Sequence, residues 1–151
     1  LLRHPRARSP LSEFAEGRFR PVLGDPERAA ADRVVLCTGK VYYDLVGSDA
    51  RAESPDTALL RLERLYPFPA RELRAALEGL GSPADVTWVQ EEPRNMGAWR
   101  HVEPRLRELL SDPDGLRYVG RPAMASPAEG YKQEHEEEQA RIVRDAFGAA
   151  G

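Results

Sequence analysis

Two cationic side chains stand just after short hydrophobic runs, where strands of a parallel sheet would end. Lys40 follows the run 33–37, and Arg121 follows the run 116–119. Because α/β sheets bind ligands at the carboxyl ends of their strands, we expect both cations to lie near that edge. Ser126 is expected to cap a helix whose free amides favour phosphate, and arginine can bind phosphate in a bidentate manner. Lys40, Arg121 and Ser126 therefore predict a regulatory site for an anion or nucleotide.

Two features qualify this prediction. Ser126 and Glu129 match a capping box, in which the hydroxyl and the carboxylate three residues later bind helix-start amides. Glu91 and Glu92 fall at the end of another predicted strand, and only one of two neighbours can face a given side of a sheet. A simpler alternative is that Arg121 pairs with Glu91 or Glu92 and locks the loops. The two interpretations are compatible, since a ligand phosphate could displace the carboxylate.

Other motifs carry no catalytic chemistry. Cys37 lies within a buried run, where a thiol is usually an inert small hydrophobe. Residues 79–84 resemble a dinucleotide fingerprint, but they follow a helix instead of a strand. Lys40 resembles the end of a P-loop, yet Val34 replaces its first glycine and Val41 its Ser or Thr. The sequence therefore predicts no catalytic residue and no dinucleotide or triphosphate site of these kinds.

The composition of the chain argues against several classes of protein and binding site. The chain has 151 residues, 41% of them hydrophobic, which suits one folded domain. A net charge of −3 argues against nucleic acid. One cysteine and three scattered histidines argue against a disulfide framework and a metal site. We expect no membrane segment and no signal peptide, because no hydrophobic run is long enough and early arginines interrupt the N-terminus. A first residue other than Met suggests a piece of a longer polypeptide.

Hydrophobic patterning predicts alternating strands and helices. Strands are expected at 33–37, 58–62, 86–90 and 116–119. Helices are expected at 41–46, 70–80, 98–110 and 131–147. This order predicts an α/β fold, a three-layer, open and mostly parallel sheet. Residues 1–32, with a short helix near 10–14 and an extended piece near 19–23, are interpreted as a connector, and 33–151 as the α/β domain.

Six segments in order carry a family resemblance. They are Arg3-His4-Pro5, Cys37 to Leu45, Leu65-Tyr66-Pro67-Phe68-Pro69, Gln90-Glu91-Glu92-Pro93 with Asn95 and Gly97-Ala98-Trp99, Tyr118 to Ala123, and Ala125-Ser126-Pro127. Together they closely resemble the C-terminal domain of the decarboxylating first component of 2-oxoglutarate dehydrogenase. The resemblance covers nearly the whole chain.

The resemblance implies a transketolase C-terminal-type fold within a large homodimeric enzyme of the citric acid cycle. The parent enzyme would use thiamine diphosphate and magnesium to decarboxylate 2-oxoglutarate and pass the succinyl unit to a lipoyl arm of the dihydrolipoyl succinyltransferase component. The domain itself would assemble the dimer, support the cofactor domains and in some members bind AMP or acetyl-coenzyme A. The expected compartment is the cytoplasm for a bacterial source, or the mitochondrial matrix for a eukaryotic one.

The cofactor motif of that family is missing from this sequence. Gly24-Asp25 is followed by Pro26 instead of glycine, and Asn95 is the sole asparagine, although the motif needs a pair. We therefore expect no bound thiamine diphosphate and no activity of this piece alone. Two alternatives remain open: a freestanding nucleotide-binding α/β module, and the same domain of a 2-oxoadipate dehydrogenase.

The proline-rich turn at 65–69 predicts an interface. Aromatic residues are favoured in interface cores. Pro67 and Pro69 stiffen the turn and lower the entropy lost on docking. Tyr66 and Phe68 are therefore predicted to contact another domain or the dimer partner, although both could instead fill the domain's own core.

Overall fold

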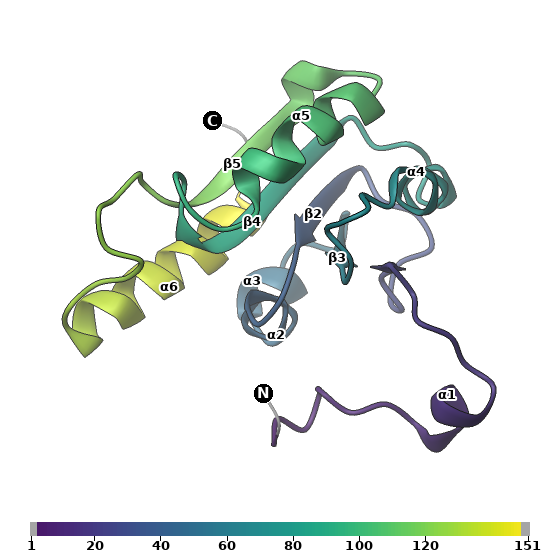
Figure 1. Ribbon diagram of the computed structural model, residues 1–151, viewed down its shortest axis with the longest axis horizontal. Helices are drawn as coiled ribbons and strands as arrows, with labels where there is room; N and C mark the ends of the chain where they lie inside the picture. Colours follow the sequence, from purple (N-terminus) through teal and green to yellow (C-terminus); the bar gives the residue numbers. More distant parts are fainter. Residues whose placement is uncertain (1–2, 149–151) are drawn as a thin grey trace.

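A computed structural model describes residues 3–148 of the chain (Figure 1). Within this part, five strands form one sheet in the order β1-β3-β2-β4-β5. The strands are β1 (Val22–Leu23), β2 (Arg33–Cys37), β3 (Thr57–Leu62), β4 (Asp85–Pro93) and β5 (Leu116–Arg121). The helices are α1 (Leu11–Ala15), α2 (Val41–Val46), α3 (Asp49–Ala52), α4 (Ala70–Gly79), α5 (Trp99–Leu109), the 3-10 turn η1 (Pro113–Gly115) and α6 (Lys132–Phe147).

The sheet is parallel except at one edge. β2 pairs in parallel with β3 and β4, β4 pairs in parallel with β5, and β1 runs antiparallel to β3. In β2, Val34 to Cys37 are all buried, which requires helices on both faces of the sheet because neighbouring side chains point in opposite directions. The predicted three-layer, mostly parallel α/β fold is confirmed.

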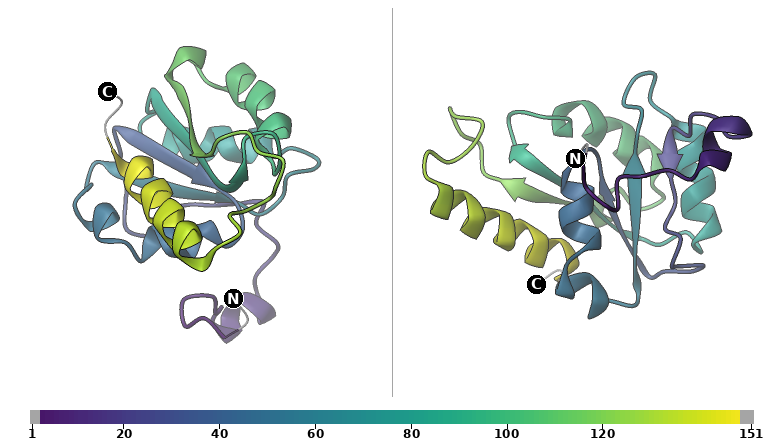
Figure 2. Two further views of the ribbon diagram at one scale, coloured as in Figure 1. Left: turned by 90° about the vertical axis from the view of Figure 1, so that its left-hand side faces the viewer. Right: turned by 90° about the horizontal axis from the view of Figure 1, so that it is seen from below.

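Helices cover both faces of the sheet (Figure 2), and each face has its own hydrophobic core. On one face, α4 and α5 pack Leu73, Trp99 and Leu106 against Trp88 of β4. On the other face, α2 and α6 contribute aliphatic and aromatic side chains to a second core cluster. These side chains are Val41, Leu45, Ile142, Ala146 and Phe147. The apolar stripes of the amphipathic helices therefore supply both outer layers.

Most predicted elements lie within two or three residues of the observed ones. The four parallel strands and helices α2, α4, α5 and α6 are all present. The helix α5 runs through Pro104 without interruption. Two short elements, α3 and η1, were not predicted, because four and three residues are too few to show a period.

The second half of the predicted connector is attached to the sheet. β1 pairs with Arg61 and Leu62 of β3, within the predicted extended piece. Beyond it, Asp25 has no exposed side-chain surface and forms a 2.9 Å ion pair with the buried Arg51 of α3. The same carboxylate accepts the Leu59 N–H at 2.8 Å. This hydrogen bond replaces the backbone bond that β1 would supply if the strand continued past Leu23. Residues 22–25 thus belong to the folded body, while the division of the chain at residue 32 stays a prediction.

None of the helices within residues 3–148 has the length and hydropathy needed to cross a membrane.

Candidate functional site

The strand order reverses between β2 and β4, and their carboxyl ends define the candidate site. β2 leads to β3 on one side, whereas β4 and β5 lie on the other. A crevice outside such a reversal is where open α/β sheets place ligands. Lys40 follows β2, Glu91 lies near the end of β4, and Arg121 ends β5. The structure therefore brings the strand-end residues singled out in the sequence to one edge.

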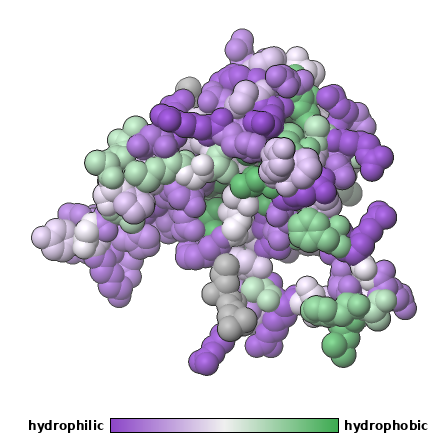
Figure 3. All heavy atoms as spheres, viewed as in Figure 1, coloured by the Kyte–Doolittle hydropathy of each residue, from purple (hydrophilic) through white to green (hydrophobic). Residues whose placement is uncertain are grey.

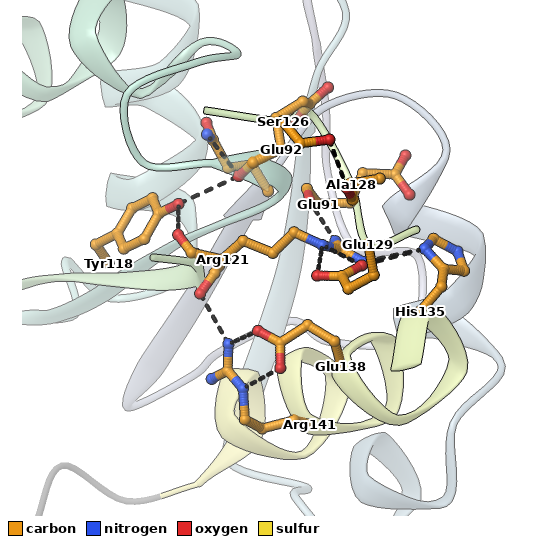
Figure 4. A network of polar contacts seen from close by, with 12 residues as sticks. Glu91, Glu92, Tyr118, Arg121, Ser126, Ala128, Glu129, His135, Glu138 and Arg141 are labelled. Atoms are coloured by element: carbon orange, nitrogen blue, oxygen red, sulfur yellow. Dashed lines mark hydrogen bonds and ion pairs between the residues drawn. The ribbon is translucent and has the colours of Figure 1, made fainter. Parts of the chain in front are cut away.

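Arg121 is the centre of a polar network at this edge (Figure 4). Its side chain is 1% exposed and forms a bidentate ion pair with Glu129: Nε lies 2.8 Å from Oε1, and Nη2 lies 2.9 Å from Oε2. Nη1 donates to the carbonyl of Glu91, and Nη2 also donates to Nδ1 of His135 at 3.1 Å. These hydrogen bonds from Arg121 hold the pKa of the Glu129 carboxyl below its ordinary value. Each of the three guanidinium nitrogens thus has a partner within the protein.

The partner of Arg121 corrects a prediction. We expected Glu91 or Glu92 to neutralise it, but the carboxylate comes from Glu129 in the loop between β5 and α6. Glu91 supplies only its backbone carbonyl, while its side chain lies 3.4 Å from Lys40 Nζ. A bidentate match between guanidinium and carboxylate outcompetes the strand neighbours because the loop is free to place Glu129 in line with the arginine.

Lys40 takes part in a second, more exposed pair. Its Nζ lies 2.6 Å from Asp44, one turn along α2, and 3.4 Å from Glu91. Burial on its own would lower the pKa of Lys40, but the hydrogen bond to Asp44 and the two carboxylate charges raise it. Lys40 therefore stays protonated. It lies at the predicted edge, although the structure gives it separate partners from those of Arg121.

Ser126 does not cap a helix, so this part of the prediction is wrong. α6 begins at Lys132, six residues later, and its N-cap Tyr131 makes no side-chain cap bond. The Ser126 hydroxyl instead donates to the Ala128 carbonyl at 2.8 Å. The capping box fails because Arg121 binds the Glu129 carboxylate that would have folded back on the helix start.

The loop 122–131 is held at two points, by the turn that follows β4 and by the end of β5. Near its start, Asn95 donates to the Met124 carbonyl at 2.9 Å and accepts the Met124 N–H at 3.0 Å. Near its end, Glu129 is held by Arg121. Sequence reasoning missed Glu129 and Asn95 as network members, although Glu129 was named in the capping box and Asn95 in a segment of the family resemblance.

Arg141 of α6 extends the same network. Its Nη2 donates to the Gly120 carbonyl at 2.9 Å, and its guanidinium pairs with Glu138 and Asp145. These hydrogen bonds raise the pKa of Arg141 and lower that of Glu138. A shallow groove of about 490 Å³ runs past this arginine and the end of β5. Helix α6 is therefore tied to the sheet edge by charge as well as by its hydrophobic face.

The predicted interface residues differ in their environment. Tyr66 is 81% exposed, whereas Phe68 is half-buried and packs against the core beneath α4 and α5. Next to Tyr66, a pocket of about 360 Å³ opens between Leu65, His101 and Glu92. His101 Nε2 lies 2.9 Å from the Leu65 carbonyl and fixes the start of the turn. Of the two aromatic residues of this turn, Tyr66 is thus the one that is free to contact another surface.

The fold belongs to a known class of domain. A split-gene transketolase, described as an inactive β4 tetramer, superposes with a TM-score of 0.62 at 21% identity, over 86% of this chain and 42% of that chain. At this identity the likeness concerns the fold alone. The chain thus has the transketolase C-terminal-like α/β fold that its strand order and helical layers indicated.

Sequence comparison then gives the family. Residues 8–147 match the family model described as 2-oxoglutarate dehydrogenase C-terminal. The chain is 45% identical over 150 residues to the 2-oxoglutarate dehydrogenase E1 component of Cupriavidus necator, and 42% identical over 150 residues to that of Haemophilus influenzae. Each alignment covers 97% of this chain and 16% of the relative. The chain belongs to the 2-oxoglutarate dehydrogenase C-terminal family, and it spans about one sixth of the length of these relatives.

Proposed function

We propose that this chain is the non-catalytic assembly and regulatory domain of a 2-oxoglutarate dehydrogenase E1 component. The parent enzyme would be a cytoplasmic homodimer in a bacterium, or a mitochondrial one in a eukaryote. It would decarboxylate 2-oxoglutarate with thiamine diphosphate and magnesium and pass the succinyl unit to the lipoyl arm of the dihydrolipoyl succinyltransferase. The observation that carries this proposal is the family match, which takes in nearly all of this chain but a sixth of its relatives.

The described residues do not fit the magnesium diphosphate group of thiamine diphosphate. Two carboxylates at the sheet edge already face cations, Glu129 with Arg121 and Glu91 with Lys40. Within residues 3–148, no three His, Cys, Asp or Glu side chains are grouped in a way that could hold a metal ion. We therefore derive no catalytic step from this domain and assign the cofactor to the rest of the parent polypeptide.

The test compares the full-length polypeptide with this chain alone. The full-length protein should release carbon dioxide from 2-oxoglutarate with thiamine diphosphate and magnesium, while the chain alone should release none above a cofactor-free control. Circular dichroism of the chain alone shows whether it is folded. Carbon dioxide release by the chain alone, or a full-length protein that prefers 2-oxoadipate, would overturn the proposal. A native polypeptide of about 17 kDa would favour the freestanding module instead.

We also propose that the turn around Tyr66 contributes to the dimer interface. Phe68→Ala in the full-length enzyme should weaken the dimer, but it also removes contacts within the domain's core. Tyr66→Ala is therefore the cleaner variant, because its side chain is 81% exposed. A buried aromatic interface residue contributes about 2 kcal/mol, so the dimer dissociation constant should rise roughly thirtyfold. Tyr131→Ala, another exposed tyrosine, is the matched control. An unchanged dissociation constant for Tyr66→Ala rules this surface out.

The regulatory anion site remains a proposal, for AMP or acetyl-coenzyme A. Lys40 and Arg121 lie at one edge of the sheet, but Arg121 is occupied by Glu129. A ligand phosphate would therefore have to displace that carboxylate. Calorimetric titration of both ligands into the full-length enzyme, wild type and Arg121→Ala, tests this. Loss of a charged hydrogen bond should cost about 1.5–3 kcal/mol, whereas equal affinities remove Arg121 from the site.

A further inference from the structure

The segment of residues 3–21, here called the arm, carries hydrophobic side chains that the domain does not cover. Leu11 is 86% exposed, Phe14 79% and Phe19 66%. No residue of α1 is buried. Figure 3 shows hydrophobic atoms gathered on the projecting part at the lower right, where Figure 1 places α1. Large hydrophobic groups clustered on a surface mark an interaction site.

Both ends of the arm are held by the body of the domain. At the first end, Arg6 Nη1 donates to the Val46 carbonyl at 2.7 Å, and the His4 ring lies 5.0 Å from that of Tyr43 on α2. At the other end, the Pro21 carbonyl accepts the Glu63 N–H at 2.9 Å. The arm is therefore a closed loop that stands off the domain from two fixed points.

The middle of the arm lacks comparable support. Arg20 and Glu13, which are both exposed, form a 3.0 Å ion pair within the arm. Exposed pairs contribute at most about 1 kcal/mol. A helix of five residues is not stable in water on its own and needs packing against another surface. The side chains that such packing would use are those of Leu11, Phe14 and Phe19.

We propose that Leu11, Phe14 and Phe19 dock on the domain that precedes this one in the same full-length polypeptide. The inference rests on the proposed function only in requiring that such a domain exists. The relatives are about six times as long as this chain, and the matched family is their C-terminal part. The first described residues and α1 project from the same side of the body in Figure 1 and in the left view of Figure 2, so the preceding polypeptide would emerge on the side that carries the exposed side chains.

Trypsin cleavage of the full-length protein tests the docking directly. The bonds Arg8–Ser9 and Arg18–Phe19 lie on either side of α1. In the wild type both bonds should be cut at least tenfold more slowly than in a synthetic peptide of residues 3–22. The double variant Leu11→Asp/Phe14→Asp should lose this protection, because a buried carboxylate would prevent docking. Since α1 buries nothing within its own domain, the domain should still fold.

Two control variants separate the loss of docking from other effects of substitution. Phe14→Leu should keep the protection, since a hydrophobic group remains, and Tyr131→Asp should keep it as an exposed position elsewhere. Peptide-like cleavage in the wild type, or full protection in the double variant, would overturn the docking. Protection that disappears on dilution to monomers would also overturn it, because the occupant would then be a second copy. The readout is independent of decarboxylation, so an inactive protein with a protected arm would reject the proposed function alone.

Discussion

Removing the carboxylate of Glu129 should destabilise the domain strongly, although Glu129 lies in a loop. Glu129→Ala leaves the Arg121 guanidinium, whose side chain is 1% exposed, without its counter-charge. Breaking a buried ion pair on one side typically costs 3–5 kcal/mol. Arg121 keeps its bonds to the Glu91 carbonyl and to His135, and Glu129 is 13% exposed, so water can enter. We therefore expect the lower end, about 3 kcal/mol.

This cost is measurable by urea unfolding followed by circular dichroism. For a domain of this size, 3 kcal/mol corresponds to a fall of roughly 6–12 °C in Tm. The double variant Arg121→Met/Glu129→Leu should recover much of the loss, because an apolar pair removes the unpaired charge. A Glu129→Ala variant within 0.5 kcal/mol of the wild type would refute the view that this pair holds the loop.

The same pair should make stability depend on pH in one direction. Hydrogen bonds from Arg121 lower the pKa of Glu129 in the folded state relative to its ordinary value of 4.5. The unfolded chain therefore binds the proton more readily, and the contribution of the pair is complete above the ordinary pKa. It is lost as the pH falls through the lower, folded value. Below pH 4.5 the wild type should lose stability faster than Glu129→Ala, and parallel curves would contradict this.

Three further predictions concern buried groups. Asp25→Asn should destabilise the domain by about 3 kcal/mol in urea unfolding, because Arg51 loses its buried counter-charge. Glu27 pairs with the same arginine from its exposed side, so the control variant Glu27→Gln should cost less than about 1 kcal/mol. Gln90→Leu should cost at least about 2 kcal/mol, since its Oε1 accepts the Trp88 Nε1–H and a backbone N–H in the core; an unchanged Tm would contradict this. Burial raises the pKa of the Cys37 thiol, so iodoacetamide at pH 8 should label this cysteine only after urea unfolding. Rapid labelling of the folded chain would contradict this and would show that the strand opens.

The position of Gln90 shows how a local irregularity escapes sequence reasoning. The register between β4 and β5 shifts between Val89 and Pro93, so the end of β4 bulges. Gln90 is fully buried there and donates to the carbonyls of Glu92, Pro93 and Met96. A bulge depends on how the strand pairs with its neighbour, and the hydrophobic pattern of a single strand carries no information on that pairing.

The predicted interface residues Tyr66 and Phe68 also show what sequence and tertiary structure each determine. The spacing of Tyr66 and Phe68 around two prolines indicated an aromatic, proline-rich turn, and in the structure this segment connects β3 to α4. Which of the two faces outward depended on α4 and α5, because Phe68 reaches the core beneath these helices while Tyr66 does not.

By itself, the sequence determined the layered α/β fold. Hydrophobic patterning is a local property, so β2, β4 and β5 were visible in the runs 33–37, 86–90 and 116–119. It also placed Lys40 and Arg121 at one edge, because parallel strands share their carboxyl end. Tertiary structure alone decided that Arg121 pairs with Glu129. The choice among acidic residues follows the path of a loop, and that path depends on where α6 packs on the finished sheet.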